Sequence, residues 1–295
     1  MTSVFNLEDS LVIGHDYIQE RNRWFAVIWS ETGLGKSYLS LGFPPPLYIY
    51  SLDTDGPFPA LRKKIKDNEL RPDQVFITEG WKACFGNDIP FVMKPSDYSK
   101  IWKYSLDWIE AVSKEHGNSG GTMIIDAAST LWKICSEVTV EPRKKAAEAA
   151  KQKFLQFDWK YANEAFSTPI KGVRATGLNL VLLNQASEIH NAKGQATGLY
   201  RYHGNKTVRE EADIVIRIGI DQNPKDLSIK SRWILVEKCR DDNSLIGAVL
   251  RDGEVDFSGI EDMLIGTEIP DERMEVLAIG DRLDETAGLD DEEKK

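Results

Sequence analysis

The sequence predicts an α/β fold with a mostly parallel twisted sheet, helices on both of its faces and an antiparallel hairpin near the C-terminus. A glycine-rich turn at 30–37 directly follows an apolar run and precedes a helical pattern. Farther on, strand patterns succeed one another at about 213–219, 231–238 and 245–250, the last two forming the hairpin around 240–243. Short apolar runs typical of strands buried on both faces alternate with helical patterns; these runs are 25–29, 47–52, 75–77, 122–126 and 178–183.

Helical patterns occupy the intervals between these runs. A short helix after the glycine-rich turn must end at Gly42 and the three prolines that follow it. Apolar residues at helical spacing predict a helix over 97–115, so the aromatic residues there are interpreted as core. Pro142 suits the first turn of a long helix to about residue 166, which begins with a basic stretch. The remaining predicted helix spans about 57–68.

Length and charge indicate one large domain between a short N-terminal segment and an acidic C-terminal tail. The chain has 295 residues, of which 41% are hydrophobic, which is enough for a substantial core. We expect an N-terminal lead-in at 1–24, the main domain at 25–265 and a disordered acidic tail at 266–295. Residues 268–295 contain 11 acidic and 4 basic side chains, a net charge of −7 out of −10 for the whole chain. The negative charge therefore does not argue against a nucleic-acid partner for the main domain.

The composition also bears on the cellular location. The three cysteines, Cys84, Cys135 and Cys239, are far apart and lack metal-ligand spacing, so we expect neither a disulfide framework nor a zinc site. No apolar run approaches the roughly 18 residues of a membrane helix, and the first residues lack the pattern of a signal peptide. We therefore expect a cytoplasmic protein without a membrane partner.

The glycine-rich turn is interpreted as a phosphate-binding loop. Its backbone N–H groups and the start of the next helix would face a polyphosphate. Lys36 would reach the β- and γ-phosphates and the Ser37 hydroxyl would bind Mg²⁺. Ser30 stands where the usual pattern begins with glycine. The residues predicted to bind ATP are Ser30, Glu31, Thr32, Gly33, Leu34, Gly35, Lys36, Ser37 and Tyr38.

Two carboxylates are expected at the same edge of the sheet, since each follows a predicted strand. Asp126 would hold Mg²⁺ through a water molecule, opposite the Ser37 hydroxyl. Asp55 could orient or deprotonate the water that attacks the γ-phosphate. An Asp-Gly pair is also a common turn, so spacing alone leaves the role of Asp55 open.

Three segments resemble RecA-like ATPases. Asp53-Thr54-Asp55-Gly56-Pro57-Phe58, with Arg62 after it, is similar to the Asp-Thr-Glu-Gly-x-Phe-x-x-x-Arg segment of archaeal and eukaryotic strand-exchange recombinases. The resemblance implies that Asp55 is the catalytic carboxylate, one methylene shorter than the family's glutamate. Asn184-Gln185 resembles the Asn-Gln pair that follows the fourth core strand of the family. The resemblance implies that Gln185 senses the γ-phosphate. Lys238 and Arg240 resemble a Lys-x-Lys element that reaches the nucleotide of the neighbouring subunit, much as an arginine finger does.

The layout over about residues 22–255 is most similar to phage-encoded RecA-like AAA ATPases, including those assigned to single-strand annealing. This resemblance implies a RecA-like P-loop NTPase fold and self-assembly into a filament or ring. If the chain is encoded by a phage, its location would be the host cytoplasm. A single-strand-binding or replication protein is a further partner to consider.

The segment 186–206 is predicted to be a glycine-containing loop that binds single-stranded DNA. It interleaves basic and aromatic side chains, which can neutralise phosphates and stack on bases. A mobile surface loop without a partner is the alternative. The candidate nucleic-acid residues are Lys193, Tyr200, Arg201, Tyr202 and Lys206.

The combined prediction is a Mg²⁺-dependent ATPase that couples ATP binding and hydrolysis to single-stranded DNA in recombination, annealing or repair. One alternative is a replicative helicase or helicase loader with the same core. Another is a small-molecule or nucleoside kinase, and a third is a nucleotide-gated DNA-binding module with little or no hydrolysis.

Overall fold

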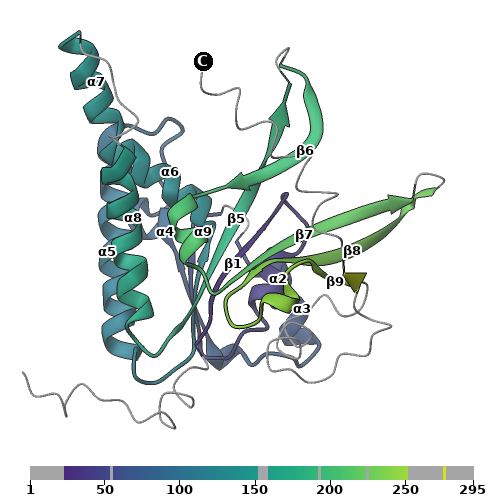
Figure 1. The fold of residues 1–295 in the computed structure, drawn as a ribbon. Helices are drawn as coiled ribbons and strands as arrows, with labels where there is room; N and C mark the ends of the chain where they lie inside the picture. Colours follow the sequence, from purple (N-terminus) through teal and green to yellow (C-terminus); the bar gives the residue numbers. More distant parts are fainter. Residues whose placement is uncertain are drawn as a thin grey trace, which may run out of the picture.

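A computed structural model of the chain describes residues 23–53, 56–151, 159–191, 194–223, 226–251 and 275–276. The predicted lead-in (1–24) and acidic tail (266–295) lie almost entirely outside these residues. The described strands form one ten-stranded sheet (Figure 1). They are β1 (Phe25–Ser30), β2 (Leu47–Ser51), β3 (Val75–Glu79), β4 (Thr122–Asp126), β5 (Asn179–His190), β6 (Ala196–His203), β7 (Ile214–Asn223), β8 (Asp226–Cys239), β9 (Ala248–Arg251) and β10 (Glu275–Val276).

The sheet has a parallel centre and an antiparallel extension. The order is β10-β9-β8-β7-β1-β5-β4-β2-β3, and β6 pairs with the outer part of β5. Strands β3, β2, β4, β5, β1 and β7 run parallel to one another, whereas β8, β9, β10 and β6 pair antiparallel with their neighbours. Because the carboxyl ends of parallel strands share one edge, the segments that follow β1, β2, β4 and the buried part of β5 are brought together there.

Helices cover both faces of the sheet. They are α2 (Lys36–Ser40), α3 (Phe58–Lys66), α4 (Gly80–Phe85), α5 (Pro95–His116), α6 (Ala128–Thr139), α7 (Glu141–Ala149), α8 (Trp159–Arg174) and α9 (Lys206–Glu211), with short 3-10 turns at Pro72–Gln74 and Asn243–Leu245. Figure 1 shows α5, α6 and α8 on one side of the sheet, which we call the helical face. Helices α2 and α3 lie on the other side, which we call the loop face.

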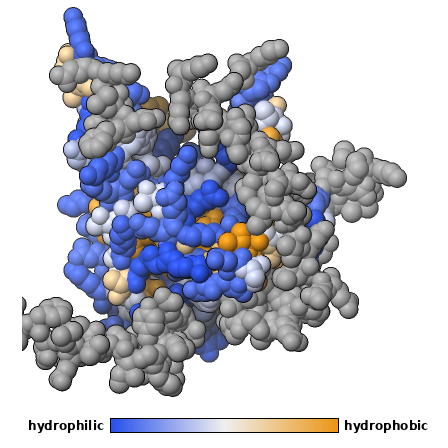
Figure 2. All heavy atoms as spheres, viewed as in Figure 1, coloured by the Kyte–Doolittle hydropathy of each residue, from blue (hydrophilic) through white to orange (hydrophobic). Residues whose placement is uncertain are grey.

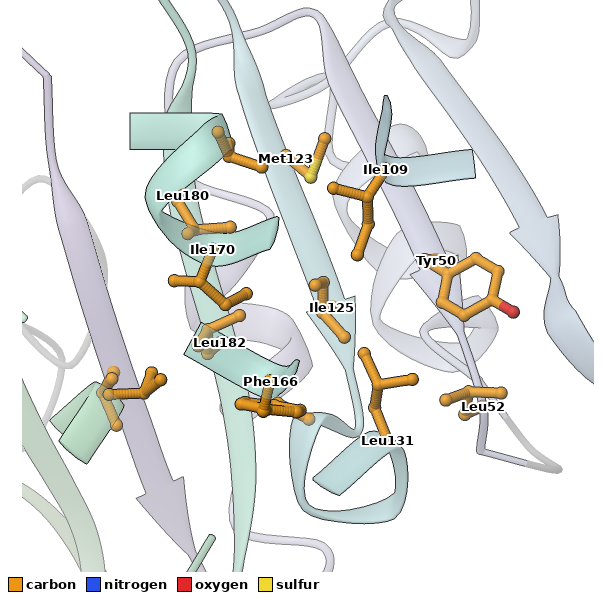
Figure 3. Close-up of a cluster of buried hydrophobic side chains, with 14 of the residues drawn as sticks. Tyr50, Leu52, Ile109, Met123, Ile125, Leu131, Phe166, Ile170, Leu180 and Leu182 are labelled. Atoms are coloured by element: carbon orange, nitrogen blue, oxygen red, sulfur yellow. The ribbon is translucent and has the colours of Figure 1, made fainter. Parts of the chain in front are cut away.

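Alternating side chains of β1 explain why this strand is buried on both faces. Phe25, Val27 and Trp29 pack on the helical face, and Ala26 and Ile28 pack on the loop face. Figure 3 shows the core of the helical face, where Ile109 of α5, Leu131 of α6 and Ile170 of α8 meet side chains of β4 and β5. Because the apolar runs are buried in this way, the described surface in Figure 2 is mainly hydrophilic, with hydrophobic side chains near its centre and in small areas elsewhere.

The fold class is confirmed, including every predicted strand and the β8–β9 hairpin. Two segment predictions are wrong. The expected long helix 142–166 is divided between α7 and α8, and α8 continues past Pro169 to Arg174. The expected loop 186–206 is instead an antiparallel hairpin, because β5 runs on to His190 and pairs with β6. Helices α4 and α6 were not predicted. No described helix is both long and apolar enough to cross a membrane.

Asp213 ties the start of the sheet to its antiparallel extension. Its carboxylate accepts from the Phe25 backbone N–H at 3.1 Å and forms ion pairs with Arg174 at 3.2 Å and Arg240 at 2.8 Å. The Asp213 side chain is 16% exposed, so these bonds are poorly replaced by water.

Asp213→Ala should lower the free energy of unfolding by about 2 kcal/mol, because it leaves two guanidinium groups without this carboxylate. Urea denaturation monitored by circular dichroism would measure the change. Asp73→Ala is the matched control, since Asp73 pairs with Arg71 at a site where both side chains are 71% exposed. The control should cost less than about 0.5 kcal/mol. Equal losses in the two variants would contradict a structural role for Asp213.

Candidate functional site

The predicted phosphate-binding loop connects the end of β1 to the start of α2. Gly33 has a φ of +84° and Gly35 a φ of +102°, both in the left-handed region that favours glycine. These two glycines let the chain turn tightly between a buried strand and a helix of five residues. The loop therefore lies at the carboxyl edge of the sheet, where the sequence places it.

Lys36 folds back over this loop. Its Nζ donates to the carbonyl oxygens of Ser30 at 3.1 Å and Glu31 at 2.9 Å, and to Ser30 Oγ at 3.1 Å. Burial lowers the pKa of Lys36, and the charges of Asp126, Asp53 and Glu31 oppose this shift. The loop thus holds a buried cationic group at the position where a polyphosphate would supply stronger partners.

Ser37 and Asp126 form the candidate metal-binding pair. Ser37 Oγ donates to Asp126 Oδ2 at 2.9 Å, although the two residues are 89 positions apart in the chain. Asp126 is 4% exposed, and burial raises its pKa while the bond from Ser37 opposes the rise. A hydroxyl and a carboxylate are oxygen donors of the kind that Mg²⁺ prefers, and it usually keeps several water ligands beside them. The donor set therefore fits the predicted ion.

A further acidic residue lies at the end of β2. Asp55 is outside the described residues, so its predicted position stays a prediction. Asp53 is exposed, and its charge is close enough to influence the pKa values of both Lys36 and Asp126. No role of its own was predicted for Asp53 from the sequence. Ser51 pairs with Asp126 in the β2–β4 register, so Asp53, two residues after Ser51, follows β2 at the same edge of the sheet. Its place directly after the predicted strand 47–52 is the sequence signal that could have pointed to it.

Gln185 lies beside the first residue of the phosphate loop. It pairs with Ser30 in the β1–β5 register, and its backbone N–H donates to Ser129 Oγ at 3.3 Å. The same strand continues without interruption into the β5–β6 hairpin. Gln185 therefore joins the loop to the predicted nucleic-acid segment through continuous backbone.

The β5–β6 hairpin also approaches the phosphate loop through a side chain. The pKa of Tyr200 is raised, first by the charge of Glu31 and then by hydrogen bonding to that carboxylate. Arg201, the next residue on β6, and Lys206, at the start of α9, are exposed. Lys193 lies outside the described residues.

Tyr202, by contrast, is partly buried and packs against the core of the helical face. Its ring meets Trp29 edge to face with centroids 6.2 Å apart, and the Arg209 guanidinium lies 5.2 Å from the ring centroid. Its hydroxyl donates to the Asn205 carbonyl at 3.4 Å, and burial raises its pKa. Alternation along β6 turns Tyr202 inward between two exposed neighbours, so it has a packing role in this structure, and its stacking on a base stays a prediction.

Lys238 and Arg240 bind the end of α9 within the same chain. Lys238 Nζ donates to the carbonyl oxygens of Glu210 and Ala212, the latter at 2.7 Å. Arg240 donates to the Glu211 carbonyl at 2.9 Å. Cations at the C-terminus of a helix satisfy carbonyl groups that have no partner within the helix. The sequence resemblance gave no indication of this capping role.

A second connection missed by the sequence analysis passes through Glu237. Its Oε2 accepts from Trp29 Nε1 at 2.7 Å and from Arg209 at 2.7 Å. Trp29 immediately precedes Ser30, so this carboxylate fixes the base of the phosphate loop to β8 and α9. Single residues of this kind carry no motif, which is why the sequence did not single them out.

These features can be compared with known proteins. The family model for the AAA domain matches residues 22–240, which is more than half of the chain. The chain belongs to this family. The AAA domain includes the phosphate loop, Asp126 and both hairpins, β5–β6 and β7–β8. It is a P-loop ATPase domain that binds nucleotide, typically with Mg²⁺, and Lys36, Ser37 and Asp126 are the residues that fit those ligands here. No curated protein matches the sequence significantly.

Proposed function

We propose that this AAA domain is a RecA-like, Mg²⁺-dependent ATPase that couples its nucleotide state to single-stranded DNA in recombination, annealing or repair. Lys36 and the loop backbone would bind the phosphates, and Ser37 and Asp126 would hold the Mg²⁺ that neutralises phosphate charge. Asp55 would orient the attacking water, and Gln185 would respond to the γ-phosphate.

The observation that carries this proposal is the strand register: Ser30 of the phosphate loop pairs with Gln185 of β5, and the same strand pairs with β6, where Glu188 lies opposite Tyr200. The charge of Glu31 also raises the pKa of Tyr200. Glu31 is the second residue of the phosphate loop, and Tyr200 lies on the hairpin that contains the candidate DNA residues. A change in the loop when nucleotide binds would alter the environment of Tyr200 directly. The exposed cation that follows it, Arg201, would then contact a phosphate of the strand.

The supporting surface is small but has suitable chemistry. Arg201 and Lys206 offer exposed cations, and Lys193 adds a third within the same segment of the sequence. Tyr200 supplies an aromatic ring beside them, and base stacking on such a ring does not depend on sequence. We therefore propose single strands, in which the bases are accessible, as the preferred form.

Assembly into a filament or ring is part of the proposal, with one change in the role of two residues. Lys238 and Arg240 would have to leave the end of α9 to reach a neighbouring nucleotide. Their bonds within the chain instead support a role in holding α9 against β8. The charge that stabilises the phosphates must then come from other groups.

Single-stranded DNA should increase steady-state ATP turnover in the wild type, and Tyr200→Phe should remove most of that increase. The variant keeps the ring but loses the hydroxyl, whose pKa is raised by the charge of Glu31, so turnover without DNA should change little. Phosphate release measured with and without an unstructured oligonucleotide tests both statements, with duplex DNA and single-stranded RNA as comparison ligands.

Each outcome has a distinct meaning. ATP turnover of the wild type that does not change when DNA is added would contradict the coupling of hydrolysis to DNA binding. ATP and DNA binding without turnover would indicate a nucleotide-gated binding module. Directional unwinding of a duplex would indicate a helicase. Equal stimulation of the wild type and Tyr200→Phe would show that coupling does not pass through the Tyr200 hydroxyl.

A further inference from the structure

Arg232 lies against the phosphate loop, although nothing in the sequence pattern links the two. A Cβ added to Gly35 would stand 3.6 Å from Arg232 Nη1. Gly35 directly precedes Lys36, so the guanidinium lies beside the most constrained part of the loop. Figure 1 shows how this comes about, since β8 runs along the sheet next to α2.

The register of the β7–β8 hairpin holds Arg232 in this position. Arg232 pairs with Ile220, and the next residue, Trp233, pairs with Gly219. The Trp233 ring occupies the space where a Gly219 side chain would lie, with ring carbons 2.0–2.4 Å from the ideal Cβ, and its Nε1 donates to Asp221 at 3.0 Å. Any larger residue at position 219 would clash with this ring. Close packing between Gly219 and Trp233 therefore fixes the position of β8 against β7.

Alternation along β8 then directs Arg232 to the loop face. Ile234 and Val236 belong to the core cluster of that face, which also contains Leu39 of α2. Arg232 shares their side of the strand because side chains two residues apart point the same way. Trp233 points to the opposite side and anchors the strand from there.

Among the described residues, Arg232 has no anionic partner. In the part of the chain that the structure describes, no hydrogen bond or ion pair involves its guanidinium, and it is exposed. Nearby cations are engaged: Lys36 with loop carbonyls, and Arg251 with Asp221 at 2.5 Å. Two positive groups, Arg232 and Lys36, thus approach the same short loop, and Lys36 already has acidic side chains close by. A polyphosphate on the loop would supply the missing partner.

We propose that Arg232 binds the nucleotide phosphates from the same chain, together with Lys36. This inference rests on the proposed nucleotide site and adds a residue to it from β8. The planar guanidinium forms paired hydrogen bonds with phosphate oxygens, which an ammonium group cannot do. Arg232 would thereby supply, without a neighbouring subunit, charge that the sequence resemblance attributes to Lys238 and Arg240.

The position beside Gly35 predicts which phosphates are involved. Backbone groups of such a loop hold the α- and β-phosphates, whereas the lysine reaches the β- and γ-phosphates. Arg232→Gln should therefore weaken ATP and ADP binding to a similar degree, by about tenfold. AMP binding should change less, because AMP lacks the β-phosphate.

The test is a titration of the full chain with fluorescent ATP and ADP analogues, in the presence of Mg²⁺ and without DNA. Arg232→Lys should give an intermediate affinity, since it keeps the charge but loses the fork geometry. Arg71→Gln is the matched control, because it removes one charge from an exposed turn where the side chain is 71% exposed. It should bind as the wild type does. Thermal unfolding of each variant shows whether the fold is kept.

The outcomes separate this inference from the function on which it rests. If the wild type binds ATP, Lys36→Ala abolishes binding and folded Arg232→Gln binds within twofold of the wild type, the role of Arg232 is overturned while the nucleotide site stands. A selective loss of ATP affinity with unchanged ADP affinity would overturn the assignment to the inner phosphates. Absence of nucleotide binding by the wild type would overturn both proposals. If Arg232→Gln does not fold, Arg232→Lys decides by the same criteria.

Discussion

Lys36→Ala should lower steady-state ATP turnover by about a hundredfold or more, the range found when a preorganised charge is removed from a phosphate or oxyanion site. The structure gives the reason. Lys36 is buried, its pKa is lowered by that burial, and its Nζ is held over the loop by three oxygen acceptors. A water molecule in the space of the lost side chain would carry no charge to the phosphates.

The measurement is phosphate release at saturating Mg²⁺, together with a direct titration of nucleotide binding. Lys66→Ala is a suitable control, because Lys66 is exposed in the last turn of α3 and the substitution removes the same charge. Turnover of Lys36→Ala equal to that of Lys66→Ala would contradict the assignment of the phosphate loop. A lowered midpoint of thermal unfolding in Lys36→Ala alone would indicate that Lys36 also supports the loop itself.

The parallel centre of the sheet was predictable because its strands are buried on both faces. Strands such as β1 and β4 consist of continuous apolar runs, since each packs against helices on two sides. The short helix after the loop was predictable from Gly42 and the prolines behind it. These local signals are strong, and tertiary packing reinforces them.

The β5–β6 hairpin was harder to predict because its outer part leaves the core. Strand β5 is buried through Asn184 and becomes partly exposed beyond it, where its pattern turns polar and resembles a loop. The pairing with β6 compensates for the missing apolar contacts through backbone hydrogen bonds. A polar, glycine-containing segment can therefore be a strand when a second strand of the same chain pairs with it.

The candidate site was predictable where residues follow strands and was missed where they lie within strands. Ser37 and Asp126 come after β1 and at the end of β4, and the structure brings them within hydrogen-bonding distance. Glu237 and Arg232 are inner residues of β8, and they reach the site only because β8 runs antiparallel beside β7. That neighbourhood depends on sheet order, which sequence periodicity does not specify. The same limit explains why the contacts of Lys238 and Arg240 with the carbonyl groups at the end of α9 were not predicted.

Asp55→Asn should reduce ATP turnover by about a hundredfold while leaving ATP binding nearly unchanged. Removal of a group that orients or deprotonates the attacking water typically has an effect of about 10²–10⁴ on the chemical step. Asparagine has almost the same size and forms hydrogen bonds, but it cannot accept the proton of the water. The expected result is therefore a loss in kcat with an unchanged affinity, unlike the result for Lys36→Ala.

Asp53→Asn is the control that makes this test specific, because the two acids are two positions apart in the same segment. Asp53 is exposed and influences the pKa values of Lys36 and Asp126, so its loss should alter nucleotide affinity modestly and leave most of the turnover. Single-turnover hydrolysis in both variants, with ATP affinity measured in parallel, separates the two effects. If Asp53→Asn loses turnover and Asp55→Asn keeps it, the water-orienting carboxylate is Asp53. The resemblance to the recombinase segment would then assign the catalytic role to the wrong residue, two positions too far along the chain. A glutamate at the position that carries the activity should then increase the rate, because the added methylene extends the reach of the carboxylate toward the water.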